Sequence, residues 1–442
     1  MLQLVFGLDS FVELSMKKLC VVSALCLMCA CQATAVMAEG FAMTQWSARG
    51  LALAGGMVGR ADDPSAIAYN AAGITLLPGT QVMGGIAGGV SKNVIDMDNH
   101  LGEVTSTANN SSSIQFAPNA YLSHQLNDRY WLGFGLFSRF GINNAFPDDW
   151  PGRYDVVSTK LKTFSLVPTV AMKVNEHLSV SVGLEVMYAS LTKASQIPVY
   201  AYSSNVYPTK QEDNKMTLDG SNWGIGAHLG VHLRLSDKLY VGFSYKSPVT
   251  VNLDGGADFS RNTANVLAET NQVPHAIDTG TRTKIRLPDS FALGLTYYPQ
   301  DNLSIEVGSV FTRWSVYDSL YTEFDSNFQL DEKREWDDGW NFNASVEYKP
   351  MDWLALRAGI WHETPVTNRA YPSFIVPGHG RTGVSVGTGF KWDNWRLDMG
   401  YAHVWIHGMH ANDIYVGALT GASMESHDLS DNIFSASISY TF

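Results

Sequence analysis

One stretch of this 442-residue chain has the residue types and spacing of a nucleophilic catalyst. Residues Gly383 to Gly387 read G-V-S-V-G and match the G-x-S-x-G pattern, in which a serine stands on a sharp turn between a strand and a helix. Here the alternation of side-chain types continues up to Phe390, as in a strand. The stretch therefore predicts a strand of small residues, and we expect that the protein is not an enzyme.

Three histidines near the C-terminus have side chains that a metal ion could bind. They are His403, His407 and His410. In an extended strand His403 and His407 share a face, but about 13 Å separates them, which is too far for a single ion. We therefore expect no metal site and no cofactor.

Strands must carry these residues, and the last eleven residues show the strand pattern most clearly. From Asn432 to Phe442 large apolar residues alternate with serine or threonine, which gives one apolar face and one small polar face. The chain then ends on the aromatic residue Phe442. This ending is typical of a bacterial outer-membrane barrel, with apolar residues toward lipid and polar residues toward the lumen. A half-buried strand of a soluble β-domain is the alternative.

Fourteen segments have the alternating pattern of strands. They lie near residues 81–91, 114–125, 130–140, 161–174, 178–192, 220–235, 239–250, 284–298, 303–317, 338–348, 354–363, 382–390, 395–408 and 432–442. Short turns such as Asn175-Glu176 alternate with long connections such as 251–283 and 409–431. The sequence therefore predicts an all-β fold, a transmembrane antiparallel up-and-down β-barrel of about fourteen strands, with short periplasmic turns and long outer loops.

The N-terminal residues predict export. Lys17 and Lys18 precede an apolar run from Leu19 to Ala30, and small residues follow up to Ala38. This is the pattern of a secretory signal peptide, and the run is shorter than the roughly 20 residues of a membrane-spanning helix. We expect residues 1–38 to be an N-terminal extension and signal peptide, with cleavage after Ala38. All four cysteines lie within this segment.

Composition agrees with an exported barrel and argues against nucleic acid as a partner. The net charge is −12, whereas phosphate binding needs a basic face. Several aromatic residues are expected at the membrane interfaces, namely Tyr130, Trp131, Trp353, Trp395, Tyr440 and Phe442. We expect a monomer in the outer membrane of a Gram-negative bacterium, in contact with lipid and lipopolysaccharide.

Residues 39–80 have no strand pattern and precede the expected barrel at 81–442. Eight strands already make a barrel that its own side chains fill, so fourteen strands leave a lumen that needs a plug. We expect residues 39–80 to be that plug. Asp62 and Asp63 could form a paired-carboxylate site, but Asp63 followed by Pro64 is typical of a helix start, with Asp63 as the N-cap.

Several motifs in and after the expected plug resemble those of one protein family. Gly40–Gly56 reads G-F-A-M-T-Q-W-S-A-R-G-L-A-L-A-G-G, and Ala61–Leu77 reads A-D-D-P-S-A-I-A-Y-N-A-A-G-I-T-L-L. Asp148–Tyr154 reads D-D-W-P-G-R-Y, and Leu287–Leu295 reads L-P-D-S-F-A-L-G-L. These stretches resemble the FadL/TodX outer-membrane transporters. The resemblance implies hatch-gated, passive transport of long-chain fatty acids or other hydrophobic molecules, with lateral release through a kinked third strand.

The resemblance also implies which residues form the gate. The turn of the hatch is expected at Asn70, Ala72 and Gly73, where this chain reads N-A-A in place of the family's Asn-Pro-Ala. We place the kink of the third strand at Phe140-Gly141, because glycine accepts the backbone geometry of a bulge. A strand that simply ends in a loop at Gly141 is the alternative.

Ligand contacts are implied less directly. The stretch 146–154 is expected to form part of a capture groove, and Ser190 and Asp337 occupy the positions of the family's basic pair. Lys193 or Arg334 would then have to bind a carboxylate in their place. The expected substrate-binding residues are Phe140, Phe146, Trp150, Lys193 and Arg334.

The substrate class stays open at this stage. By alternation, a set of charged residues is expected to point into the lumen: Lys246, Arg286, Arg357, Arg396, Glu185 and Asp398. A charge network of this kind more often keeps a lumen polar and rigid than binds a headgroup. An importer of aromatic hydrocarbons is therefore an alternative to a fatty-acid transporter, and a general porin or a receptor is another.

Overall fold

The computed structural model describes the chain from residue 40 onward, with gaps. The described residues are 40–98, 104–109, 115–197, 213–260, 278–326, 328–369, 371–372, 374–376, 378–416 and 419–442. The expected signal peptide lies outside these residues. Among the helices of the described part, each is too short to cross a membrane.

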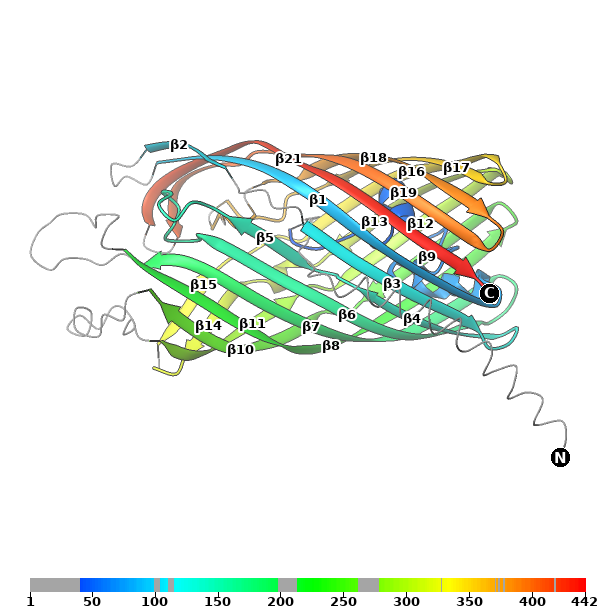
Figure 1. The fold of residues 1–442 in the computed structure, drawn as a ribbon, viewed down its shortest axis with the longest axis horizontal. Helices are drawn as coiled ribbons and strands as arrows, with labels where there is room; N and C mark the ends of the chain where they lie inside the picture. The colour runs from blue at the N-terminus through cyan, green and yellow to red at the C-terminus, as the bar shows by residue number, and fades with distance from the viewer. Residues whose placement is uncertain are drawn as a thin grey trace, which may run out of the picture.

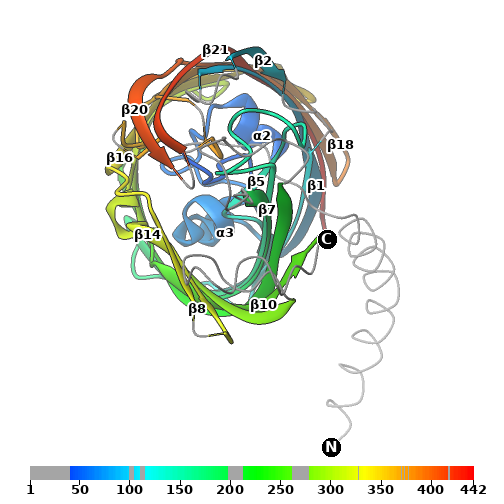
Figure 2. The same ribbon diagram turned by 90° about the vertical axis from the view of Figure 1, so that its left-hand side faces the viewer.

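The strands form one closed antiparallel barrel with fourteen wall strands, as predicted (Figures 1 and 2). The wall strands are β1 (Thr80–Asp98), β3 (Gln115–Gln125), β4 (Tyr130–Phe137), β6 (Ser158–Lys173), β7 (Leu178–Ile197), β8 (Asn214–Ser236), β9 (Leu239–Lys246), β12 (Ser290–Gln300), β13 (Leu303–Thr312), β16 (Gly339–Met351), β17 (Leu354–Glu363), β18 (Arg381–Trp392), β19 (Trp395–Ile406) and β21 (Leu419–Thr441). The barrel closes where β21 pairs with both β19 and β1.

Seven further strands extend this wall toward the end of the barrel opposite the C-terminus (Figure 1). β5 (Gly141–Ala145), β10 (Val249–Phe259) and β11 (Thr279–Leu287) continue the third, seventh and eighth wall strands. The other four are β2 (Val104–Asn109), β14 (Ser319–Phe324), β15 (Gln329–Lys333) and β20 (His410–Val416). A short 3-10 helix, η2 (Trp314–Val316), follows β13.

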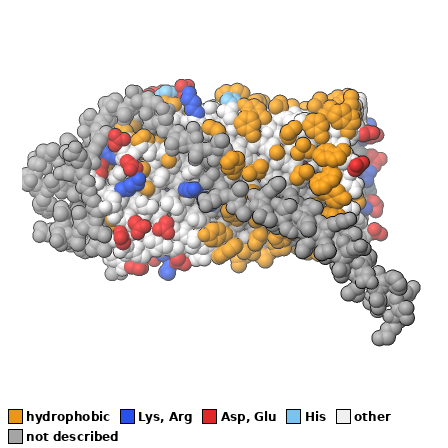
Figure 3. Space-filling view, in the orientation of Figure 1, with side chains coloured by type: hydrophobic (Ala, Val, Ile, Leu, Met, Phe, Trp, Pro, Cys, Tyr) orange, Lys and Arg blue, Asp and Glu red, His pale blue; other side chains and the backbone are white. Residues whose placement is uncertain are grey.

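The outer surface of the barrel has an apolar band. Val182, Ile225 and Phe434 keep more than half of their surface exposed, and Figure 3 shows hydrophobic side chains gathered over the half of the wall nearer the C-terminal end. Charged side chains lie at the rim of that end and over the other half (Figure 3). The prediction that Trp131 lies at the membrane interface is wrong. Its side chain is buried, and its Nε1 donates to the carbonyl of Leu77 at 2.8 Å.

In two neighbouring wall strands, β9 and β12, the alternation of buried and exposed side chains shifts by one residue at the junction with β10 or β11. Lys246 of β9 is buried, and after Ser247-Pro248 the buried residues of β10 shift to odd positions such as Val249. β11 and β12 show the same change across Pro288-Asp289. Proline has no N–H for the ladder, so a strand is interrupted there and its alternation restarts. The prediction that Arg286 faces the lumen is wrong for this reason, since its side chain is exposed.

Residues 40–79, which we call the inner segment, lie inside the ring of strands (Figure 2). The segment forms α2 (Ala48–Ala52), α3 (Ala66–Tyr69) and the 3-10 helix η1 (Ala71–Leu76). The N-cap of α3 is Ser65, so the prediction that Asp63 is the N-cap is wrong. Asp63 lies two residues before it, and its Oδ1 accepts from the Ser65 N–H at 2.9 Å. Asp62 and Asp63 both also bind Arg49, at 2.6 and 3.1 Å, so the pair is a structural ion-pair site.

Candidate functional site

The third wall strand is interrupted near its middle. β4 ends at Phe137 and β5 begins at Gly141, which places the break at residues 138–140, beside the predicted kink. β4 pairs with both neighbours, β3 and β6, whereas β5 pairs with β6. The facing stretch of β3, residues 115–119, pairs with β1. Among the described strands no ladder joins β3 to β5, so the wall has a break in its hydrogen bonding here.

The inner segment supplies the partner that the broken strand lacks. Phe140 forms an isolated bridge with Ala42. The Met43 N–H donates to the Arg139 carbonyl at 2.7 Å, and the Gly141 N–H donates to the Phe41 carbonyl at 2.9 Å. Buried backbone groups need partners, so these bonds tie the position of the break to the position of the inner segment.

An aromatic cluster lies at the same level inside the barrel. Phe41 packs edge-on against Trp314 at 4.7 Å and against Phe140 at 6.3 Å between ring centroids. Tyr317 and Trp336 complete the cluster. All five side chains are buried. The structure thus places Phe140, a predicted ligand contact, at the meeting point of the inner segment and the strand break.

The two aromatic residues predicted for a capture groove pack against each other. Phe146 and Trp150 stack with a centroid distance of 4.3 Å, and Trp150 meets Phe374 edge-on at 5.1 Å. Both are almost fully buried. Their role in ligand capture remains a prediction, and it would require this packing to open.

Lys193 and Arg334, the predicted headgroup residues, come together but are already paired. Both contact the Glu332 carboxylate at 2.5 Å, and Arg334 lies 3.9 Å from Asp155. Burial raises the pKa of the Asp155 carboxyl. Two cations therefore face two carboxyl groups, those of Glu332 and the buried Asp155, which leaves little net positive charge for a ligand.

The predicted hatch turn is anchored to the wall, not to the break. The Asn70 side chain donates to the carbonyls of Val58 at 2.9 Å and Val231 at 3.0 Å, and its Oδ1 accepts from the Ala72 N–H. A side chain at Gly73 would collide with the Ala61 carbonyl, 2.2 Å from an added Cβ, so glycine is required there for close packing. Whether this turn gates transport stays a prediction.

Arg139, within the break, was missed by the sequence reasoning. Its guanidinium binds the Glu185 carboxylate at 2.5 Å and donates to the carbonyls of Ser247 and Pro288, each at 3.2 Å. Those two carbonyls belong to the interruptions between β9 and β10 and between β11 and β12. One side chain therefore links three interrupted strands. The only hint in the sequence is a single charged residue between two apolar strand segments, S-R-F-G at 138–141.

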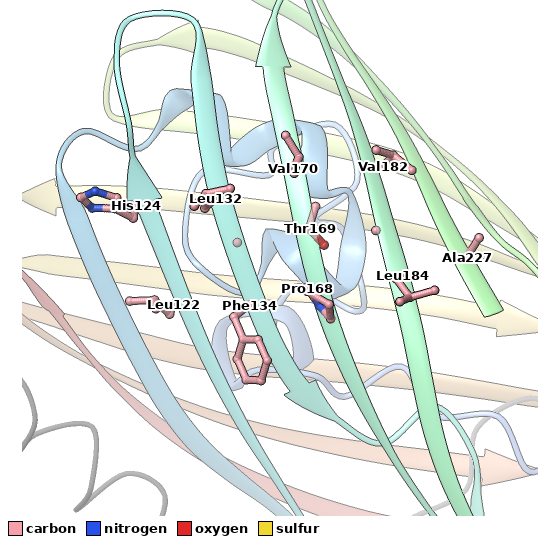
Figure 4. Close-up of a pocket in the computed structure, with 12 residues that line it drawn as sticks. Leu122, His124, Leu132, Phe134, Pro168, Thr169, Val170, Val182, Leu184 and Ala227 are labelled. Atoms are coloured by element: carbon pink, nitrogen blue, oxygen red, sulfur yellow. The ribbon is translucent and has the colours of Figure 1, made fainter. Parts of the chain in front are cut away.

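A shallow hollow of about 780 Å³ lies on the wall at β3, β4, β6, β7 and β8 (Figure 4). Exposed apolar side chains line it, among them Leu122, Phe134 and Leu184. Pro168 stands in the middle of β6, and the β6–β7 ladder skips its position, passing from Leu166 to Thr169. The hollow faces outward and ends close to the break, since Phe134 lies three residues before the end of β4.

This architecture can be compared with known proteins. The family model for the outer membrane protein transport proteins (OMPP1/FadL/TodX) matches residues 29–442. The chain belongs to this family. As a member of the FadL/TodX family it is an integral outer-membrane β-barrel and a transport protein, in agreement with the resemblance seen in its motifs.

The relatives within the FadL/TodX family are distant in sequence. The chain is 25% identical to outer membrane protein P1 of Haemophilus influenzae, over 85% of this chain and 88% of the relative. It is 24% identical to a long-chain fatty acid transport protein of Escherichia coli, over 97% and 100%. Among solved structures, a Pseudomonas aeruginosa FadL homologue has a TM-score of 0.82 at 19% identity, over 91% of this chain and 100% of that chain. The Pseudomonas putida toluene transporter TodX has a TM-score of 0.68 at 15% identity, over 90% and 99%.

Proposed function

We propose that this protein lets long-chain fatty acids or similar hydrophobic molecules diffuse passively across the outer membrane and leave sideways through the break at residues 138–140. One observation carries the proposal. The break lies in the wall beside an internal aromatic cluster, and the inner segment holds its backbone. A small movement of Phe41 to Met43 would therefore open or close the path between the lumen and the wall.

Lateral exit agrees with the energetics of an apolar ligand. Each CH₂ group moved from an apolar environment into water costs about 0.8 kcal/mol, so release into lipid is far easier than release into the periplasm. The outward hollow beside the break offers an apolar surface to such a ligand. The inner segment acts in this proposal as a hatch, and most of its side chains are buried within the barrel.

A second candidate substrate is a neutral aromatic hydrocarbon. The names of the relatives include both substrate classes, long-chain fatty acids and toluene. The observation that favours the neutral class is the pairing of Lys193 and Arg334 with Glu332, since paired cations attract a carboxylate weakly.

Uptake in cells tests the lateral route. A Gram-negative strain without its own importer would express the wild type, Gly141→Val or the control Gly256→Val, and labelled hexadecanoate and toluene would be offered. Gly256 accepts a side chain, because the nearest atom to an added Cβ is 3.5 Å away. We expect Gly141→Val to lower uptake while its barrel stays heat-resistant, and Gly256→Val to behave as wild type.

Unchanged uptake in Gly141→Val would contradict the lateral route. Recordings in planar bilayers address the porin alternative, because a barrel filled by its inner segment should be nearly silent. A steady ionic conductance of the wild type would favour the porin.

A further inference from the structure

Lys246 is a buried lysine at the end of β9 and is 4% exposed. Among the described residues, its ammonium group has no hydrogen bond or ion pair. It lies over the ring of Trp46, with 4.6 Å between Nζ and the ring centroid. Burying an unpaired charge is costly, so the position of Lys246 calls for a counter-charge.

Glu185, the carboxylate that interacts with Lys246 in the described part of the chain, is already bound by other groups. Glu185 accepts from Arg139 at 2.5 Å and from Ser165 at 2.6 Å, and it lies 3.0 Å from His228 Nε2. With Arg139 and Lys246 both charged, the group carries one positive charge in excess. His228 faces Lys246 directly across the β8–β9 pair, and its Nδ1 has no partner among the described residues. The remaining cross-strand neighbour of Lys246 is the neutral Ser290 of β12.

The inner segment leaves space on its side of this group. Ala42, Thr44 and Trp46 are only half-buried although they lie inside the ring of strands, so each borders space within the barrel. Trp46 is fixed in place, because its Nε1 donates to the Ser138 carbonyl at 2.8 Å and its own carbonyl accepts from Tyr121 Oη at 2.7 Å. Lys246 therefore lies on a rigid aromatic surface that is attached to the strand break.

We propose that Lys246, seated on Trp46, binds the carboxylate of a long-chain amphiphile inside the barrel, next to the break. The inference rests on the proposed transport function and selects its substrate class. A monocarboxylate matches the single excess charge, whereas a neutral hydrocarbon would leave Lys246 unpaired. The position also explains why the paired Lys193 and Arg334 are not needed as the headgroup site.

Equilibrium binding to the detergent-purified full-length protein tests whether Lys246 binds the carboxylate. Hexadecanoate and hexadecanol have the same chain and differ in headgroup charge, so their affinities are compared in the wild type, Lys246→Met and the control Lys284→Met, whose lysine is exposed on β11. We expect Lys246→Met to weaken hexadecanoate binding at least tenfold, as for loss of a charge-assisted hydrogen bond, and to change hexadecanol binding less than twofold. Lys284→Met should leave both affinities within twofold of wild type, and Lys193→Met is measured as the alternative headgroup site.

Two further measurements separate binding from folding. Lys246→Arg keeps the charge and should keep most of the hexadecanoate affinity, and heat-resistant migration on gels confirms that each variant is folded. The carboxyl ¹³C resonance of labelled hexadecanoate should shift between wild type and Lys246→Met.

Three results would overturn the proposal. Equal hexadecanoate affinity in wild type and Lys246→Met is the first, and equal weakening of both ligands is the second, because that indicates a structural role. A loss confined to Lys193→Met is the third, since it moves the headgroup site to Lys193 of β7. These results leave hydrophobic transport intact, whereas a wild type that binds neither ligand would contradict both proposals.

Discussion

The substitution Arg139→Met should lower the free energy of unfolding of the barrel, because Arg139 forms a buried ion pair at the strand break. In Arg139→Met the buried Glu185 would keep Ser165 and His228 but lose the cation at 2.5 Å. Breaking a buried ion pair by removing one partner typically costs about 3–5 kcal/mol, because the other charge loses its direct partner. Lys246, the remaining cation of the group, has no ion pair with Glu185 among the described residues. The carbonyls of Ser247 and Pro288 would also lose a donor. We expect a loss of about 3 kcal/mol or more in the free energy of unfolding.

A double-mutant cycle tests whether the loss of stability comes from the ion pair between Arg139 and Glu185. Urea unfolding in detergent is followed by the heat-resistant gel band and extrapolated linearly to zero denaturant. Arg139→Met combined with Glu185→Gln should be more stable than Arg139→Met alone, because the double variant also removes the carboxylate that has lost its hydrogen-bonded cation. Arg282→Met, which removes an exposed ion pair with Asp254, is the control and should change nothing measurable. If Arg139→Met unfolds like the wild type, or if the double variant is the least stable of all, the reasoning is wrong.

Two further predictions concern the loop at residues 146–157. Trp150→Ala should expose this loop to limited proteolysis while the barrel stays heat-resistant, because the stack with Phe146 and the edge contact with Phe374 are lost; a loop as resistant as in the wild type would contradict this. Burial raises the pKa of Asp155 above its ordinary value of 3.8, so its contribution to loop stability is complete below 3.8 and is lost as pH rises through the raised value. The protection factor of the loop amides, which compares their exchange rate with the intrinsic rate at the same pH, should therefore be higher at acid than at neutral pH, and Asp155→Asn should remove much of that difference.

The wall strands were predictable from sequence because lipid and lumen impose opposite preferences on alternate residues. The fourteen predicted segments correspond in order to the fourteen wall strands, and the C-terminal segment lies in β21. The break in the third strand was also found, within three residues, from the glycine at 141 and the family resemblance. These features depend on local pattern, which a single sequence carries.

Contacts between distant parts of the chain were not predictable in this way. Arg286 was expected in the lumen, but a proline two residues later resets the alternation, and sequence alone does not say where a register restarts. Trp131 was expected at the membrane interface, but it binds the inner segment. The partners of Lys193 lie more than a hundred residues away, so its neutralisation by Glu332 could only be seen in the fold.

The pairing of β1 with β21 has a consequence for how the molecule is made. These strands come from opposite ends of the described barrel, yet they share a ladder from Gln81 opposite Thr441 to Asp98 opposite Ser423. Until β21 has been synthesised, the free edge of β1 presents unpaired backbone groups, and each such group is costly in hydrocarbon. An open sheet is therefore unfavourable in the bilayer and prone to aggregation outside it. Insertion into the membrane and closure of this last ladder should be coupled events, and both must wait until β21 has been synthesised.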